Sequence, residues 1–253
     1  MNVQNKTNTP HNPLEGERPE MSVNLDVSSD EKVSIVIVHK DTPEYLNMAL
    51  QSISICSMNS NYEIIVVDNG SGPESQAYLD ELEKQGSIKE IVRNEKNEYW
   101  SAAANKAAER ISPSSSYVVF MHSDVVILNP SWLDILINVC ESRQCGMVGI
   151  ELQSYKIANQ PVQFVQEWMI MLSRKCWKDV GPWPVELPQV GPSFVLTLRA
   201  NNKGYKPQII KNQLAHHYQV FNFNINDYEQ LTTEAMVTLP KMIREESTYQ
   251  LNK

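Results

Sequence analysis

Short apolar runs alternate with amphipathic segments over the stretch from residue 32 to about residue 150. The first run, Val33 to Val38, is almost continuously β-branched, and Ile64 to Val67 forms a second run of the same kind. Runs like these are typical of strands that are covered on both faces of a sheet. The segment between them has helical spacing, with apolar residues at Tyr45, Leu46, Ala49, Leu50 and Ile53. This alternation predicts βαβ units and a mostly parallel sheet.

The pattern continues with further helices and strands. We expect helices at 73–86, 97–111 and 130–142, and strands at 88–94 and 146–152. In the segment 116–127 we expect a strand that runs into the polar triplet His122-Ser123-Asp124. The second half is less regular: a strand precedes a short helix at Arg174–Val180, and a later helix ends at Gly204 before another strand. Residues 226–247 have the pattern of an amphipathic helix, which we expect Pro240 to interrupt because proline lacks the backbone N–H.

Polar residues follow the ends of three predicted strands. Asp41 comes after the first strand, Asp68 ends the second, and His122–Asp124 lies within "FMHSDVVI". Three polar groups at a buried strand end are costly unless they have partners or a function. Ligands of open sheets bind at the carboxyl ends of the strands, so we expect a ligand site at this edge. For Asn69–Gly72 a plain turn is an adequate alternative, because Asn, Gly and Ser favour turns.

The chain lacks the common loops that bind phosphate. No GxGxxG and no GxxxxGK[ST] sequence is present, which disfavours a dinucleotide-binding Rossmann site and a P-loop. A phosphate-bearing ligand would then need another partner, and a divalent metal is the obvious one. Asp124 offers the oxygen ligands that Mg²⁺ and Mn²⁺ prefer, and His217 or His216 is a candidate to complete the shell. The alternative for this histidine pair is a partly buried structural pair or an exposed loop.

Composition narrows the class of protein. The chain has 253 residues, 42% of them hydrophobic, and its formal net charge of -8 argues against binding nucleic acid through a broad basic surface. The cysteines form no CxxC pair, so we expect reduced thiols in a cytoplasmic protein. The polar residues 1–30 predict a flexible arm rather than a signal peptide, and no apolar run is long enough for a transmembrane helix.

Five motifs occur in the order and spacing typical of family 2 glycosyltransferases: "VSIVIVHKDTPEYLNMALQSI", "YEIIVVDNGSG", "NEKNEYWSAAANKA", "HSDVVI" and "SRKCWKDVGPWP". The chain resembles this family over roughly residues 32–220. The resemblance implies an α/β fold of the GT-A type, which is Rossmann-related, with a mostly parallel sheet flanked by helices in a single domain. We accordingly expect a flexible arm at 1–30, a GT-A-like domain at 31–222 and a C-terminal helical extension at 223–253.

The resemblance implies roles for individual donor-binding residues. Asp41 falls where the family usually has an Asn or Asp near the nucleotide, and Asp68 matches the Asp that contacts the base, commonly uracil. Asn97 and Asn105 match the two Asn of the family's N-x-G-x-x-x-x-x-N element, whose glycine is Tyr99 here. We therefore expect the four residues to bind the donor, with a loop that the tyrosine alters.

The triplet His122-Ser123-Asp124 resembles the family's DxD motif, with His122 in place of the first Asp. The resemblance implies that Asp124 binds Mn²⁺ or Mg²⁺ together with the donor diphosphate, and that Ser123 lies beside the donor. His217 matches a late histidine that reaches the metal in such enzymes, and Trp168 lies near the strand that usually borders the sugar pocket. The alternative for His122 is a capping or packing residue, with Asp124 acting alone.

One departure from the family concerns the catalytic base. Inverting members carry an acidic pair before a helix similar to "VLTLRANNKGY", and Pro192-Ser193 stands at that place here. A general base must lie within hydrogen-bond reach of the acceptor hydroxyl. Glu186 or Asp179, from the preceding loop, is the candidate replacement. Otherwise the enzyme is retaining, uses a more acidic acceptor, or has lost activity.

The motifs together predict a metal-assisted enzyme of polysaccharide biosynthesis. It would move a single sugar from a nucleoside diphosphate sugar, UDP-sugars first, to a glycan, lipid-linked or protein acceptor. The processive branch of the family has a QxxRW helix and transmembrane segments, and neither is present. One alternative is a non-catalytic nucleotide-sugar-binding member of the same fold. A nucleotidyltransferase is disfavoured, because "HKDTPEY" lacks a Gly-rich loop with a basic residue. We expect a cytoplasmic protein, with the inner membrane face and a homodimer contact through the extension as options.

Overall fold

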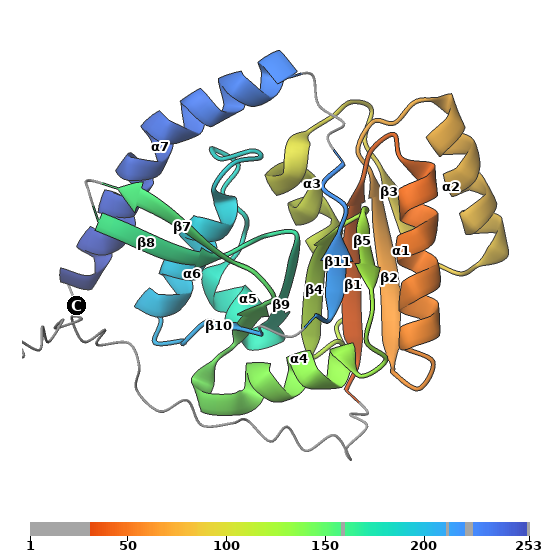
Figure 1. Ribbon diagram of the computed structural model, residues 1–253, viewed down its shortest axis with the longest axis horizontal. Helices are drawn as coiled ribbons and strands as arrows, with labels where there is room; N and C mark the ends of the chain where they lie inside the picture. Colours follow the sequence, from red (N-terminus) through yellow and green to blue (C-terminus); the bar gives the residue numbers. More distant parts are fainter. Residues whose placement is uncertain (1–30, 158–159, 211–212, 221–224, 252–253) are drawn as a thin grey trace, which may run out of the picture.

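The computed structural model describes residues 31–157, 160–210, 213–220 and 225–251 (Figure 1). Its central sheet has seven strands, which are β1 (Val33–His39), β2 (Tyr62–Asp68), β3 (Glu90–Arg93), β4 (Tyr117–His122), β6 (Met147–Gly149), β9 (Met169–Ser173) and β10 (Gln208–Ile209). Their order is β10-β6-β9-β4-β1-β2-β3. Strand β9 is antiparallel to both its neighbours, whereas the other pairs of this sheet are parallel. The predicted α/β fold with a mostly parallel sheet is confirmed.

Helices cover both faces of the central sheet. One face carries α1 (Pro43–Cys56), α2 (Pro73–Gln85) and α4 (Trp132–Glu141), and the other carries α3 (Tyr99–Ala108), α5 (Arg174–Val180) and α6 (Pro192–Asn202). A short 3-10 turn, η1 (Ser142–Gln144), follows α4. Proline begins α1, α2 and α6, where its missing N–H would have no partner in the helix anyway. The apolar runs of β1 and β2 follow from this layering, because a strand between two helical layers has no face in water.

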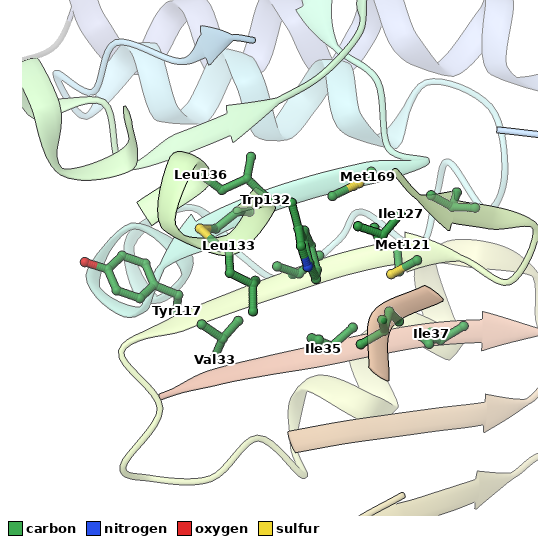
Figure 2. Close-up of a cluster of buried hydrophobic side chains, with 14 of the residues drawn as sticks. Val33, Ile35, Ile37, Tyr117, Met121, Ile127, Trp132, Leu133, Leu136 and Met169 are labelled. Atoms are coloured by element: carbon green, nitrogen blue, oxygen red, sulfur yellow. The ribbon is translucent and has the colours of Figure 1, made fainter. Parts of the chain in front are cut away.

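One core cluster fills the space between the sheet and α4 (Figure 2). Val33, Ile35 and Ile37 project from the same face of β1, because side chains alternate along a strand, and all are buried. Trp132, at the start of α4, is also fully buried, and its Nε1 donates a 2.9 Å hydrogen bond to Ser57 Oγ. Each large apolar side chain buried in this way stabilises the fold by about 1.5–3 kcal/mol. This layer holds the strands whose carboxyl ends carry the polar residues.

The strand predicted in the segment 116–127 is β4, which ends at His122, and a turn at Ser123–Asp124 separates it from a second short strand. Its second part, β5 (Val125–Ile127), leaves the central sheet and pairs antiparallel with β11 (Ala215–His217). The N–H of Tyr218 donates a 3.0 Å hydrogen bond to the carbonyl of Asp124, which ties the turn to the end of β11. The predicted strand that ends at the polar triplet is thus confirmed, whereas the pairing of the following residues with a distant segment was not predicted.

A hairpin of β7 (Leu152–Ile157) and β8 (Gln160–Val165) lies beside the central sheet, near the C-terminal helix (Figure 1). The strand predicted at 146–152 is shorter than expected. Strand β6 stops at Gly149, and the chain bends before β7 begins at Leu152. Gly149 lies tightly against β8: a Cβ at this position would be 2.2 Å from Val165 Cγ1. The absence of a side chain here lets the hairpin fold back against the sheet.

The C-terminal helix α7 (Ile225–Leu251) continues through Pro240, so the predicted interruption is wrong. Side chains on both sides of the proline pack on the cluster that α6 and β8 form, namely Ala235, Leu239, Met242 and Ile243. We attribute the continuity to this packing, which offsets the loss of one backbone hydrogen bond at the proline.

The remaining expectations concern the terminal arm, the boundary of the C-terminal extension and membrane-spanning helices. The predicted arm at 1–30 lies outside the described residues, and so does the predicted boundary at 222–223 between the domain and its extension. Over the part of the chain that the structure describes, no helix has the length and apolar character needed to cross a membrane.

Candidate functional site

The carboxyl ends of β1, β2 and β4 lie together at one side of the central sheet, which we call the carboxyl edge. In the strand register His39 pairs with Asp68, and Val38 pairs with His122. Because the three strands are parallel, the polar residues that end them are neighbours in space. The expectation that polar residues gather at one edge of the sheet is confirmed.

Three residues at the carboxyl edge form a group that could hold a metal ion. His122, Asp124 and His217 each offer one ligand atom, and these atoms all lie within 4.8 Å of one another. The pairing of β11 with β5 brings His217 to Asp124, so that its Nε2 lies 3.3 Å from Asp124 Oδ1. The neighbouring His216 is exposed, and its ring contacts Tyr218 instead. Of the two candidate histidines, His217 is therefore the one beside Asp124.

The ring of His122 carries a nitrogen suited to a metal. Its Nε2 is buried and has no hydrogen-bond partner among the described residues. Burial, followed by the charge that His217 carries when protonated, lowers the pKa of His122 to about 4. The ring is therefore neutral near neutral pH, as a metal ligand must be. A buried polar atom without a partner lowers the stability of the fold. The unpaired Nε2 of His122 is therefore consistent with a site that binds a metal ion or another ligand.

Asp124 supplies the negative charge of the group. Burial raises the pKa of its carboxyl, but the hydrogen bond and charge of His217, the charge that His122 gains only in acid, and the N–H of Val220 more than offset this. The pKa of Asp124 therefore lies below its usual value. Its two oxygens are oriented differently: Oδ1 faces His217, and Oδ2 accepts a 2.8 Å hydrogen bond from Val220 N–H. An ionised carboxylate with two imidazoles is a set of ligands that Mn²⁺ accepts.

Aromatic rings fix the orientation of the two histidines. Trp168 stacks on His217, with ring centroids 5.0 Å apart and an angle of 15° between the planes. Trp100 meets the ring of His122 edge-on at 4.7 Å. Trp168 is anchored in turn, because its Nε1 donates a 2.6 Å hydrogen bond to Glu151. Trp168, the residue predicted near the sugar pocket, thus lies directly beside His122, Asp124 and His217, the candidate metal ligands that we call the metal-binding group.

Two pockets meet at this group, a small one of about 90 Å³ and a large one of about 320 Å³. Both are lined by His122, Asp124, Gln189 and Val220. The small pocket is further lined by His39, Lys40, Asn69, Asn97 and Ser123. The large pocket is further lined by Gln166, Glu167, Trp168, His217 and Tyr228. The candidate metal ligands therefore stand at the junction of two compartments.

Asn97 belongs to a network that shapes the small pocket. Asn69 Nδ2 donates hydrogen bonds to Asn97 Oδ1 (2.9 Å) and to the Tyr99 carbonyl (3.2 Å), and Tyr99 N–H donates to Asn97 Oδ1 (2.9 Å). Tyr99 has a φ of 60°, which glycine adopts freely and a bulky residue rarely does. Gly70 passes close to this loop, since a Cβ there would lie 2.4 Å from the carbonyl carbon of Lys96. The tyrosine thus keeps a glycine-like backbone.

Asp68 and Asp41 stabilise the loops at the carboxyl edge. Asp68 is 2% exposed, its Oδ1 accepts a 2.9 Å hydrogen bond from Ser71 N–H, and its Oδ2 lies 4.0 Å from Arg93 Nη1. Asp41 Oδ1 accepts a 2.6 Å hydrogen bond from Gly72 N–H. Neither aspartate is among the residues that line the small pocket. Their contacts with a nucleotide stay predictions.

Three predicted site residues lie away from the two pockets. The side-chain amide of Asn105 is hydrogen-bonded to the backbone of Trp183. Its Nδ2 donates to the Trp183 carbonyl (2.9 Å), and its Oδ1 accepts from the Trp183 N–H (2.8 Å). Glu186 is exposed and lines neither pocket. Asp179 is also exposed, and it accepts a hydrogen bond from Tyr205. We therefore assign neither a donor contact to Asn105 nor the role of base to the two carboxylates.

The large pocket contains a carboxylate that the sequence analysis missed. Glu167 lies between β8 and β9, lines the large pocket, and accepts a hydrogen bond from Ser193 Oγ at the start of α6. Burial raises the pKa of Glu167 above its usual value, although the Ser193 hydrogen bond and the charge of His217 act against this. The one signal in the sequence is a lone acidic residue in the strand segment that borders the sugar pocket in the resembling family.

Comparison with known proteins points to one family. The model of the family described as "Glycosyl transferase family 2" matches residues 34–184. The O-antigen biosynthesis protein RfbC of Myxococcus xanthus is 29% identical over 131 residues, which cover 51% of this chain and 10% of that protein. The uncharacterized protein y4gI of Sinorhizobium fredii is 28% identical over 121 residues, which cover 47% of this chain and 13% of that protein. This chain thus matches only a small part of these curated relatives.

Solved structures share the fold at low sequence identity. The mannosyltransferase PcManGT from Pyrobaculum calidifontis, in complex with GDP-Man and Mn²⁺, has a TM-score of 0.65 and 12% identity over 91% of this chain and 72% of that one. Glucosyl-3-phosphoglycerate synthase from Mycobacterium tuberculosis, with Mn²⁺, UDP and glucosyl-3-phosphoglycerate, has a TM-score of 0.63 and 15% identity over 90% of this chain and 86% of that one. The expected GT-A-like fold is thereby confirmed.

Proposed function

Because the chain belongs to glycosyl transferase family 2, we propose that it transfers a single sugar from a nucleoside diphosphate sugar to an acceptor, with help from a divalent metal. We place UDP-sugars first, since Asp68 matches the residue that contacts the base, commonly uracil, in the resembling family. A glycan, a lipid-linked sugar or a protein is the proposed acceptor. A role in polysaccharide biosynthesis agrees with the name of the relative RfbC, an O-antigen biosynthesis protein.

The observation that carries this proposal is the position of His122, Asp124 and His217 where the two pockets meet. A nucleoside diphosphate sugar has the same arrangement in its own structure, because its charged diphosphate stands between the nucleoside and the sugar. With the nucleoside at the small pocket and the sugar in the large one, the diphosphate falls at the metal-binding group. No other described group of His, Cys, Asp and Glu side chains has a metal-binding arrangement.

The residues present fit a divalent cation. Asp124 offers one ionised oxygen, and His217 and His122 offer ring nitrogens, of which His122 Nε2 has no partner in the described part of the chain. Two imidazoles favour Mn²⁺ over Mg²⁺, which demands oxygen ligands. When bound, the cation offsets the negative charge that develops on the leaving nucleoside diphosphate. A single carboxylate carries little charge, so we expect the cation to bind tightly only together with a nucleoside diphosphate.

A donor screen tests this function. The full chain is incubated with UDP-glucose, UDP-galactose, UDP-N-acetylglucosamine or GDP-mannose, and the released nucleoside diphosphate is measured in Mn²⁺, in Mg²⁺ and in EDTA. We expect release from at least one donor, faster in Mn²⁺ than in Mg²⁺ and lost in EDTA. Failure of every nucleoside diphosphate to bind in Mn²⁺ would contradict the proposal.

A second candidate is a nucleotide-sugar-binding protein without transferase activity. The observation that favours it is the absence of a carboxylate at Pro192-Ser193, where the resembling inverting enzymes carry their acidic pair. Tight, Mn²⁺-dependent binding of UDP without release from any donor would support this candidate.

A further inference from the structure

The large pocket holds two carboxylates in different settings. Asp124 belongs to the metal-binding group, where His217 and the N–H of Val220 face its two oxygens. Glu167 lines the same pocket but is not part of that group. It is therefore the pocket carboxylate that the proposed metal site does not use.

Glu167 is held at the first turn of α6. Ser193, the second residue of that helix, is fully buried, and its Oγ donates to Glu167 Oε2. The amino end of a helix carries partial positive charge, which favours an ionised carboxylate beside it. Burial has the opposite effect, and the pKa of Glu167 lies above its usual value. A carboxylate whose pKa is raised toward the working pH removes protons more effectively than an ordinary exposed one.

We infer that Glu167 is the catalytic base that accepts the proton of the acceptor hydroxyl, and that Ser193 is the residue that positions it. The first turn of α6 has Pro192 and Ser193 and no carboxylate of its own. Glu167 comes to this turn from the connection between β8 and β9, 26 residues earlier in the chain. The inference rests on the proposed transferase function, because a proton acceptor has a task only if a hydroxyl attacks a sugar.

The proposed step is a single displacement. The acceptor oxygen forms a bond to the anomeric carbon, and the bond from that carbon to the diphosphate oxygen breaks. The electron pair of the broken bond leaves on the nucleoside diphosphate. The proton of the acceptor hydroxyl moves to Glu167, and attack from the face opposite the leaving group inverts the anomeric configuration. The balance needs no oxidant and no further reactant.

The other side chains of the large pocket suit the two groups that must meet there, the donor sugar and the hydroxyl of a carbohydrate acceptor. Gln166, Gln189 and Tyr228 offer amide and hydroxyl groups to sugar hydroxyls, and Trp168 offers a ring to the apolar C–H face of a sugar. The pocket volume of about 320 Å³ is at the lower end of the range for ligand pockets. Glu167 therefore stands in a compartment where an acceptor hydroxyl finds both hydrogen-bonding groups and a base.

The test compares wild-type protein with Glu167→Gln, which keeps the shape of the side chain and can still accept the Ser193 hydrogen bond. The donor is the one that wild-type protein consumes fastest in Mn²⁺, and the acceptor is water or azide. We expect Glu167→Gln to bind UDP and Mn²⁺ as wild type does and to release nucleoside diphosphate to water about 100-fold or more slowly. Azide carries no proton, so the variant should form the glycosyl azide at a rate near that of wild type, with inverted configuration.

Three results would overturn the inference. Release to water at the wild-type rate would show that no proton passes to Glu167. Loss of the azide reaction together with the water reaction, with UDP binding intact, would show a role other than proton removal. A glycosyl azide with retained configuration would exclude the single displacement. The three results above leave the proposed function standing, because wild-type protein still binds and consumes the donor. Failure of the proposed function has a different sign, which is that wild-type protein binds no nucleoside diphosphate in Mn²⁺.

Two further variants sharpen the test. Glu186→Gln changes the exposed carboxylate that the sequence favoured as base, and we expect its release rate to match wild type. Ser193→Ala keeps the Glu167 carboxylate but removes its hydrogen bond. We expect its kcat to fall by about 10-fold while its KM for the donor stays unchanged, since a positioning residue acts on the step and not on donor binding. A loss in Glu186→Gln that equals the loss in Glu167→Gln would contradict the assignment.

Discussion

The amino and carboxyl ends of the strands in the central sheet differ in how their buried polar groups are paired. At the amino edge, Glu63 of β2 is surrounded by partners. Lys32 and Lys89 pair with its carboxylate at 2.7 and 3.1 Å, and Ser34 and Ser112 each donate a 2.6 Å hydrogen bond to it. Every oxygen of this buried side chain is engaged from a neighbouring strand or loop. Such an arrangement joins several segments and leaves nothing for a ligand.

At the carboxyl edge, by contrast, buried polar atoms lack partners. Within the described residues, His122 Nε2 and His39 Nδ1 have none, although both histidines lie at the ends of core strands. Native proteins rarely leave buried polar groups unpaired, so each such atom calls for an explanation. The amino edge therefore serves stability alone, whereas the carboxyl edge keeps two buried histidine nitrogens available for a ligand. The variants below separate these two tasks.

Of these variants, Asp124→Asn should have the largest effect. It should weaken the binding of UDP and Mn²⁺ and leave the stability of the fold unchanged. It removes the one negative charge of the metal-binding group while keeping the shape of the side chain. We expect the affinity for UDP in Mn²⁺ to fall by at least about 100-fold, with the melting temperature nearly unchanged. Calorimetry and thermal unfolding measure the two quantities. His122→Ala is the matched variant, with an expected loss of about 10-fold; a loss as large as that of Asp124→Asn would contradict the lesser role of His122.

Glu63→Gln should have the opposite effect, because it should lower the stability of the fold and leave UDP binding unchanged. Lys32 and Lys89 would lose their ionic partner in a buried setting, so we expect the free energy of unfolding to fall by about 2–3 kcal/mol. The affinity for UDP in Mn²⁺ should stay that of wild type, because no residue of the metal-binding group changes. Urea denaturation gives the first value and calorimetry the second. A variant that loses UDP affinity but keeps its stability would reverse the assignment of the two edges.

The same residue predicts how stability depends on pH. Burial raises the pKa of Glu63, but the hydrogen bonds from Lys32, Ser112 and Ser34 more than offset this and hold the pKa well below its usual value. The stabilisation is fully present above the pKa of an unfolded glutamate, about 4.3, and is lost as the pH falls below it. Wild-type stability should drop below about pH 5, and that of Glu63→Gln should drop less. Parallel acid slopes in urea denaturation would contradict this.

Asp68→Ala lies between the two profiles, because Asp68 is at the carboxyl edge yet is already hydrogen-bonded. Its removal leaves Ser71 N–H without the carboxylate that accepts from it, in the loop beside the small pocket. We expect UDP binding to weaken by about 1–2 kcal/mol, measured by calorimetry on the folded variant. Unchanged UDP affinity would rule out a role for this carboxylate at the nucleotide.

The smallest effect concerns the backbone of Tyr99. Its φ of 60° is unfavourable for a bulky residue, and the Asn97 and Asn69 side chains hold it there. Tyr99→Gly and Tyr99→Ala both remove the ring, but only the glycine relieves the backbone. We expect Tyr99→Gly to be more stable than Tyr99→Ala by about 1 kcal/mol in urea denaturation. Equal stability would show that the backbone relaxes once the ring is gone.

The sequence predicted what depends on local pattern and order. The β-branched runs of β1 and β2 and the helical spacing between them led to a parallel sheet, because periodicity reports burial directly. The same reasoning placed Asp68 and His122 at one edge, since parallel strands end on the same side. The order of the motifs then led to His217, whose place beside Asp124 the structure confirms.

What the sequence did not predict depends on contacts between distant segments. Glu167 has no motif, and its place in the large pocket follows from the packing of β8 and α6. The division of the strand at Ser123–Asp124 follows from the pairing of β5 with β11, which no local pattern records. Pro240 predicted a break in α7, but packing on both sides of the proline prevails over the local preference.

Calorimetric titration of UDP into the full wild-type chain tests the central claim most directly, that the carboxyl edge binds a nucleoside diphosphate through a divalent metal. The titration is done in Mn²⁺, in Mg²⁺ and in excess EDTA. The account predicts tight binding in Mn²⁺, weaker binding in Mg²⁺, and a loss of affinity in EDTA of at least about 100-fold, as for removal of a metal ligand. Equal affinity in Mn²⁺ and in EDTA would contradict it. His122, Asp124 and His217 would then be a hydrogen-bonded end of two strands, with no metal to hold.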